Sequence, residues 1–259
     1  GLADDAQHML DRVLAFWLPD SGVDPGAQRF GKIRVVFDAP HPRAYSCVFY
    51  WGRAGGERVR FVRVFGFQGG VQMLAHKLTS AVFPQPDKLI RNMMGILAET
   101  RLGNPQTFPR CGFDSDEWVA ALQELQTFAP LATLGAEHES WGMRDEGNGR
   151  LVVFDRATQH RSYAEAGSFG SYLFRRYGID KVMQFHLLAH GKERPAREVF
   201  GVSLEELEAG WLEELAAGRR QREAKVLLLR RLLREDPVSA CRAAQRLAKS
   251  AQAGAANSN

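Results

Sequence analysis

The most informative segment of the sequence is Met73-Leu74-Ala75-His76-Lys77-Leu78-Thr79-Ser80, together with Pro84-Gln85-Pro86-Asp87 after it. The apolar residues of the first segment recur at helical spacing, and the two prolines of the second end that helix. Another helix is predicted from Asp87 to Leu102, where glycine and proline break the pattern. The polar residues to be explained on these two helices are His76, Lys77, Ser80 and Asn92.

The chain before these helices is predicted to form one helix and a small sheet. Apolar residues at helical spacing from Asp4 to Leu18 predict an amphipathic helix. Three runs rich in β-branched and aromatic residues then read as strands of a small mixed or antiparallel sheet. They are Lys32–Asp38, Tyr45–Trp51 and Arg58–Phe67.

The chain after them is mainly helical. A helix is predicted from Asp114 to Phe128, a long loop from Leu134 to Asn148 and a short strand from Leu151 to Phe154. From Tyr163 onward the pattern is helical almost throughout. Strands first and helices afterwards indicate an α+β fold with a mainly helical C-terminal part.

Four ranges describe the expected domain organisation. An α+β subdomain takes residues 1–155, and a helical subdomain takes 156–216. A basic helical hairpin is expected at 217–250, because apolar residues share one stripe while arginines lie mostly off it. Residues 251–259 are small and polar, which predicts a disordered tail.

Composition narrows the class of protein. The chain has 259 residues, 45% of them hydrophobic, which is enough to bury a substantial core. A formal net charge of +4 is too mild to indicate nucleic-acid binding. No run approaches the ~18 apolar residues that a membrane span requires. The sequence therefore predicts an ordinary soluble globular protein that binds no nucleic acid and spans no membrane.

The three cysteines are Cys47, Cys111 and Cys241, and none forms a C-x-x-C pair. A zinc ribbon or a thioredoxin-like redox pair is therefore not supported. The spacing leaves open whether there is one disulfide, for example between Cys47 and Cys111, or three free thiols.

The first helix resembles the zinc helix of the gluzincins, the superfamily of thermolysin-like and aminopeptidase-like zinc peptidases. In their H-E-x-x-H motif two histidines one turn apart bind zinc, and the glutamate activates a water molecule. Aligned to that motif, His76 takes the first ligand position. Lys77 stands in place of the glutamate, and Ser80 stands in place of the second histidine.

The resemblance extends from about residue 58 to residue 215. In this superfamily the third zinc ligand is a glutamate on the following helix, a position that Asn92 takes here. The segment Tyr163–Gly178 resembles the helix that follows the active site in bacterial peptidases of this type. The segment Phe200–Glu208 with Trp211 resembles their closing helix.

The residues at these positions are poor ligands for a catalytic zinc. Such a site needs three protein ligands and an open position for water. Serine and asparagine oxygens are weak zinc ligands beside imidazole. The Lys77 ammonium would repel the metal, and a protonated lysine cannot accept a proton from water. We therefore expect no zinc, no other cofactor and no peptidase activity.

These considerations predict a pseudopeptidase, that is, a metallopeptidase-like protein without catalysis that binds a peptide or regulates another protein. Peptidases of this superfamily hold extended substrates along the edge of a sheet, and that mode of binding needs no metal. The expected edge strand is Arg58–Phe67. The candidates for lining its groove are Arg63, Phe65, Phe67 and Tyr163.

Two alternatives remain open. In the first, the chain is a metal-dependent peptidase with a relocated ligand set, such as His76 with His138 or His160. In the second, the basic C-terminal helices bind another protein, an acidic surface or a second copy of the chain, although their apolar faces could equally dock on the chain's own core. Many related bacterial peptidases are exported, so an extracytoplasmic location is favoured over the cytoplasm.

Overall fold

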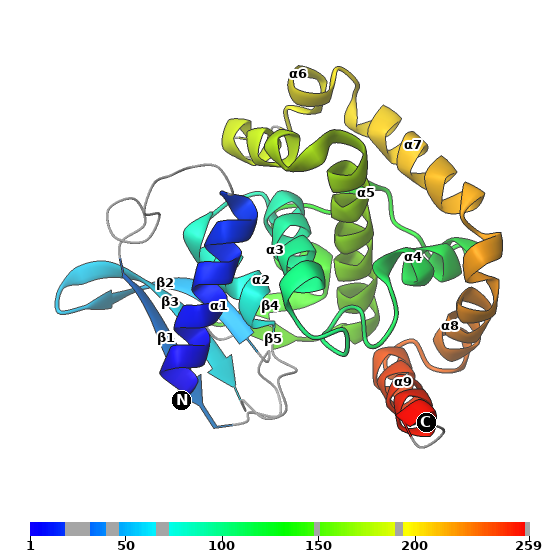
Figure 1. Ribbon diagram of the computed structural model, residues 1–259. Coiled ribbons are helices and arrows are strands. Elements are labelled where there is room, and N and C mark those ends of the chain that lie inside the picture. The colour runs from blue at the N-terminus through cyan, green and yellow to red at the C-terminus, as the bar shows by residue number, and fades with distance from the viewer. Residues whose placement is uncertain (19–31, 40–46, 66–72, 148–150, 190–193, 257–259) are drawn as a thin grey trace.

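The computed structural model describes residues 1–18, 32–39, 47–65, 73–147, 151–189 and 194–256. In these ranges the fold is α+β, with a three-stranded sheet, a two-stranded sheet and a mainly helical C-terminal part (Figure 1). The predicted fold class is confirmed.

The three-stranded sheet has the order β1-β3-β2. Strand β1 (Ile33–Asp38) runs parallel to β3 (Glu57–Phe65), and β2 (Cys47–Ala54) runs antiparallel along the other side of β3. The turn between β2 and β3 is Gly55-Gly56, where both residues have positive φ (59° and 84°), a conformation that glycine adopts without steric cost. The sheet is therefore mixed, and β2 is an edge strand within the described residues.

This order corrects the expectation that Arg58–Phe67 forms the edge of the sheet. As far as Phe65, that run is β3, which pairs with a neighbour on each side. All three strands have similar β-forming composition, so local sequence could not tell the centre from the edge. Within the described residues β1 and β2 are the two edge strands, and β2 is the one that contacts α2.

Helices α2 (Leu74–Val82) and α3 (Lys88–Leu102) follow the sheet as predicted. Every residue of α2 is buried. The Asp87 side chain caps α3 by accepting a hydrogen bond from the Ile90 N–H at 3.1 Å. The same carboxylate lies 2.7 Å from Arg194 Nε, so the start of α3 is fixed to a distant part of the chain.

Two glycines bring α5 (Arg156–Leu188) close to α3. A Cβ atom at Gly167 would lie 2.6 Å from Ile96 Cγ2, and one at Gly170 would lie 2.5 Å from Met93 Cγ. Larger residues would push the two helices apart. Farther along, α5 is kinked at Gly178, where φ is 79°.

Helix α1 (Leu2–Trp17) packs against α2. The Trp17 indole N–H donates a hydrogen bond to Thr79 Oγ1 at 3.2 Å. Arg60 Nη1 of β3 donates to the Ala81 carbonyl at 3.0 Å, which ties the sheet to the end of α2. The sheet, α1 and α2 thus hold one another in fixed positions.

Strands β4 (Met143–Asp145) and β5 (Leu151–Val153) form the small second sheet. The short strand expected at Leu151–Phe154 is therefore present, whereas the expected loop Leu134–Asn148 contains β4. A three-residue strand of mixed polarity is defined by its pairing partner, which a local pattern does not reveal.

The remaining helices are α4 (Ser115–Glu124), α6 (Ala196–Phe200), α7 (Leu204–Ala217), α8 (Glu223–Glu235) and α9 (Ala240–Ala256). In Figure 1, α7, α8 and α9 curve along one side of the body, from yellow to red. We call residues 218–256 the C-terminal arm. Helix α8 packs against α4, and its buried side chains are Val226, Leu229, Leu232 and Leu233.

The apolar stripe of the expected hairpin thus faces the chain's own core, as one of the two alternatives supposed. A single hydrophobic core extends from Val13 in α1 to Ala244 in α9, so the ranges 1–155, 156–216 and 217–250 share it. Pairing of the arm with another subunit stays a prediction.

A disulfide joins Cys111 to Cys241 in α9, with the Cα atoms 5.4 Å apart and a sequence separation of 130. Cys111 is therefore not bridged to Cys47. The bond attaches the first turn of α9, within the C-terminal arm, to the loop before α4.

Residues 251–256, expected in a disordered tail, continue α9 to Ala256, whereas 257–259 lie outside the described residues. Alanine has the highest helix propensity, and this segment is rich in it. None of the helices in the described ranges combines the length and the apolar run that crossing a membrane would take.

Candidate functional site

A cavity of about 510 Å³ lies between the edge strand β2 and helices α2 and α3. Five consecutive residues of β2, Val48 to Gly52, line it. Because successive side chains of a strand point to opposite faces, a run of this kind indicates that the cavity follows the strand's edge. An unpaired strand edge offers backbone N–H and C=O groups to a partner.

Helical spacing explains which polar side chains reach the cavity. Lys77 and Ser80 are three residues apart on α2, and Lys88, Arg91 and Asn92 fall on one face of α3. The other wall comes from the segment between α4 and α5. It supplies His138, Asp145 and Leu151, and α5 adds Tyr163.

Three of the four positions that the resemblance aligns with the zinc motif therefore meet at one cavity. Lys77, Ser80 and Asn92 all line it, although Asn92 comes from a different helix. The Ser80 hydroxyl donates to the His76 carbonyl at 3.1 Å, one turn earlier in α2. The chain thus brings together the residues that the resemblance to gluzincins singles out.

His76 is the exception, because its ring is buried and does not line the cavity. It stacks on Tyr163 with ring centroids 6.0 Å apart, and a Cβ atom at Gly95 would lie only 2.5 Å from His76 Cδ2. Burial lowers the pKa of His76 well below its usual value, and the charges of Lys77 and Arg91 lower it further. This imidazole is therefore neutral and enclosed at physiological pH.

Tyr163, from α5, is buried and forms part of the cavity wall. Its ring packs against Phe108 at 5.3 Å and Trp141 at 5.4 Å between centroids. The Lys77 ammonium lies 5.9 Å from the centroid of the same ring. Tyr163 thus joins α5 to the motif helix and presents an aromatic surface to the cavity.

Lys88 is the most unusual group at the site. Its side chain is only 1% exposed, and its Nζ atom has no hydrogen-bond partner among the described residues. Burial, reinforced by the positive charges of Arg91 and Lys77, lowers its pKa to about 6. The Lys88 amine therefore loses its proton at a much lower pH than an ordinary lysine.

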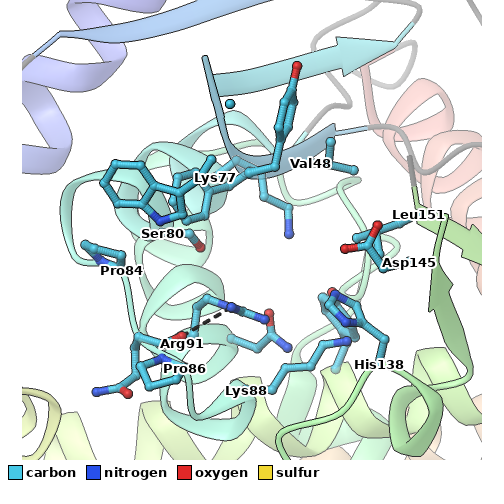
Figure 2. A pocket seen from close by; sticks show the side chains of 17 residues that line it. Val48, Lys77, Ser80, Pro84, Pro86, Lys88, Arg91, His138, Asp145 and Leu151 are labelled. Carbon is cyan, nitrogen blue, oxygen red and sulfur yellow. Dashed lines mark hydrogen bonds between the residues drawn. The ribbon is translucent and has the colours of Figure 1, made fainter. Parts of the chain in front are cut away.

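The other charged groups are arranged around an open centre (Figure 2). Arg91 Nη1 donates one hydrogen bond to the Gln85 carbonyl at 3.2 Å. His138 and Asp145 stand across the cavity from Arg91 in this view. Burial and the charge of Lys88 lower the pKa of His138 to about 4, so it too is neutral at physiological pH.

Not all of the residues predicted to line the groove lie at the cavity. Tyr163 lines the cavity, whereas Arg63 and Phe65 do not. Arg63, on the central strand, forms an ion pair with Asp38 of β1, and its guanidinium lies 5.7 Å from the Phe65 ring centroid. Phe67 lies outside the described residues.

The relocated metal set is not assembled by the described residues. His138 lines the cavity, but His160 is buried elsewhere, with Nε2 2.9 Å from the Pro109 carbonyl oxygen. In the described ranges, the histidines, cysteines and carboxylates whose ligand atoms meet as a group of three are Cys111, His160 and Cys241. The sulfur atoms of that group are joined as a disulfide.

Sequence reasoning missed Lys88 and Arg91, and it named His138 only as a candidate ligand of a relocated metal set. Lys88 precedes Asn92 by four residues in the predicted helix, so it had to share the Asn92 face. That spacing was the available signal. His138 belonged to a segment interpreted as loop, and nothing local indicated where its side chain would point.

No protein-family model, no curated protein and no solved structure matches this chain. The resemblance to gluzincins therefore rests on the order and spacing of its short motifs.

Proposed function

We propose that this protein is a catalytically inactive, metallopeptidase-like protein that binds a polypeptide segment along β2 and in the adjoining cavity. The observation that carries the proposal is the meeting of Lys77, Ser80 and Asn92 beneath an edge strand. These positions correspond to the general base and two zinc ligands of a gluzincin. Here they offer an ammonium, a hydroxyl and a carboxamide, which suit hydrogen bonding better than zinc binding.

Peptide binding fits the remaining walls of the cavity. A peptide that extends the sheet gains backbone hydrogen bonds from β2, while its side chains enter adjoining pockets. Trp51 of β2 lines the cavity, is 39% exposed and has the Arg58 guanidinium 4.3 Å from its ring centroid. A large aromatic residue of this kind is a typical binding anchor.

The disulfide bears on location. Disulfides such as Cys111–Cys241 persist mainly in oxidising compartments, which supports an extracytoplasmic location for a protein of this type.

Affinity selection from a pool of synthetic mixed-sequence decapeptides tests the proposal. We expect the full chain to retain a subset of peptides, and Trp51→Ala to weaken their binding about tenfold, the loss typical of an anchor residue. Leu187→Ala is the matched control, because Leu187 is 64% exposed and does not line the cavity. Retention of no peptide, or equal binding by both variants, would overturn the proposal.

A reconstruction tests the relation to zinc peptidases separately. The triple variant Lys77→Glu, Ser80→His and Asn92→Glu restores the motif around His76, so we expect it to bind zinc measurably more tightly than the parent. The variant Lys77→Gln, Ser80→Asn and Asn92→Gln changes the same positions without adding strong ligands. If the first variant folds but binds zinc no better than this control, the assignment of these positions is wrong.

A further inference from the structure

The starting point is the buried amine of Lys88, which lines the cavity and has no hydrogen-bond partner among the described residues. A buried polar group without a partner destabilises the folded protein, so such groups are rare unless they serve a ligand. Its aromatic contact is with Trp141, whose ring centroid lies 5.5 Å from Nζ. In Figure 2 the side chain extends across the base of the cavity toward His138.

Arg91, which is only partly buried, adds a second cationic side chain to the cavity. Its one hydrogen bond in the described structure, to the Gln85 carbonyl, leaves most of its five N–H donors available. Within the described ranges no carboxylate forms an ion pair with Lys88 or Arg91. Figure 2 shows the Arg91 guanidinium directed toward the open centre of the cavity, which the Lys77 side chain approaches from the opposite wall.

We propose that Lys88 and Arg91 form a subsite for a carboxylate group of the bound peptide. The inference rests on the proposed peptide binding and names the chemistry that the cavity selects. A guanidinium matches a carboxylate with two parallel N–H donors, and an amine can complete the contact. Asp145 on the facing wall disfavours a doubly charged anion such as phosphate, so a singly charged carboxylate fits better.

The carboxylate has two sources in a peptide, the C-terminus and an Asp or Glu side chain. Both place the same anionic group beside Lys88 and Arg91. Experiments with defined peptides can distinguish them.

Binding of a carboxylate should be linked to protonation of Lys88. An anion beside the amine raises its pKa above the value of about 6 in the empty cavity, so the complex takes up a proton between that value and the higher one. Affinity should therefore increase about tenfold for each unit of pH decrease from 8 to 6, and level off below about 6.

Several charged and titratable groups act on the Lys88 amine. Arg91 and Lys77 lower its pKa, and Glu139 and Asp145 raise it. His138, with a pKa of about 4, stays neutral throughout the range from pH 8 to 6. Lys88 is thus the group whose titration falls in that range.

The test uses two pools of the same mixed-sequence decapeptides, one with free C-terminal carboxylates and one with C-terminal amides. A C-terminal subsite predicts retention from the acid pool and at least a tenfold loss for the amide of each retained peptide. A side-chain subsite predicts retained amides that contain Asp or Glu and lose binding when that residue becomes Asn or Gln. Either outcome supports the carboxylate subsite.

Substitutions of Lys88 and Arg91, with matched controls, test whether these residues cause the preference for a carboxylate. Arg91→Gln and Lys88→Met should each weaken a selected peptide at least tenfold, and Lys88→Met should also abolish the pH dependence. Arg101→Gln, on the same helix, and Lys181→Met, on α5, are exposed controls that should leave binding unchanged.

Failure of this inference differs from failure of the proposed function. If retained peptides bind equally well as acids, amides and Asn or Gln variants, peptide binding stands and the carboxylate subsite is overturned. If neither pool yields a retained peptide, the proposed function is overturned as well.

Discussion

The C-terminal arm and the cavity both carry basic side chains, but they use them differently. In the arm, Lys225 Nζ lies 2.8 Å from Glu117 Oε1, and Arg230 Nη1 lies 2.9 Å from Glu124 Oε2. In the cavity, Lys88 and Arg91 have no such carboxylate within the described ranges. Basic residues therefore fix the arm to α4, whereas in the cavity they remain available at a cost in stability.

The net charge of +4 does not reveal this difference in ion pairing between the arm and the cavity. Both regions contribute to the positive excess, yet within the described residues Lys225 and Arg230 have carboxylate partners, whereas Lys88 and Arg91 have none. Perturbed pKa values and unpaired buried groups are typical of binding sites, where proteins give up stability for function. Three variants test this difference between the arm and the cavity.

Removal of the arm should change the free energy of unfolding more than the other two variants do. A chain ending at Ala217 loses the four buried aliphatic side chains of α8 and the disulfide to Cys241. Each buried aliphatic side chain contributes on the order of 1.5–3 kcal/mol, so we expect a loss of several kcal/mol and a melting temperature lower by more than 10 °C.

Thermal unfolding and mass in solution check this expectation. The double variant Cys111→Ala and Cys241→Ala keeps the arm and isolates the contribution of the disulfide. An unchanged melting temperature together with loss of a dimer would contradict it, and would assign the arm to an interface between subunits.

Lys88→Met should increase the free energy of unfolding, by less than removal of the arm lowers it. The substitution replaces a buried amine with an apolar side chain of similar length, so we expect a stability gain on the order of 1–3 kcal/mol at pH 7. Urea unfolding measures the gain, and Lys181→Met is the exposed control. A loss of stability would show that the amine has a partner that stabilises the fold.

The pH dependence of this gain has a definite sign. Lys88 has a pKa of about 6 in the folded protein and an ordinary value of 10.5 when unfolded, so unfolding takes up a proton between these values. The stability of the parent therefore increases with pH across this range. The advantage of Lys88→Met should shrink from pH 7 toward pH 10, and a constant advantage would argue against the lowered pKa.

Glu124→Gln should change the free energy of unfolding least of the three variants. It removes the acceptor of ion pairs with both Arg219 and Arg230, but all three side chains are partly exposed. Such pairs contribute about 1 kcal/mol or less and are screened by salt. We expect a small loss at low ionic strength that disappears in 1 M salt, with Glu213→Gln as the control on α7. A loss that persists in high salt would mean that Glu124 stabilises the fold by packing.

Much of the fold could be predicted because periodicity and breakers are local signals. Helix α3 ends at the predicted Leu102 and begins next to the predicted Asp87, since proline and the Asp87 cap mark its start. The order of strands could not be predicted in this way. Pairing of β3 with both neighbours depends on contacts between residues distant in sequence.

The site was predictable in part for the same reason. Motif spacing selected Lys77, Ser80 and Asn92, and the fold brings them to one cavity. The edge strand and His138 reach the cavity only through tertiary packing. The partner of Cys111 was equally beyond sequence, because three cysteines allow several pairings and Cys241 lies 130 residues away.

The zinc content of the purified full chain tests most directly whether the cavity is a binding site and not a metal centre. We expect elemental analysis to find far less than one zinc per chain, and the protein to cleave neither casein nor short peptides. One tightly held zinc per chain, removed by a chelator together with a hydrolytic activity, would contradict this.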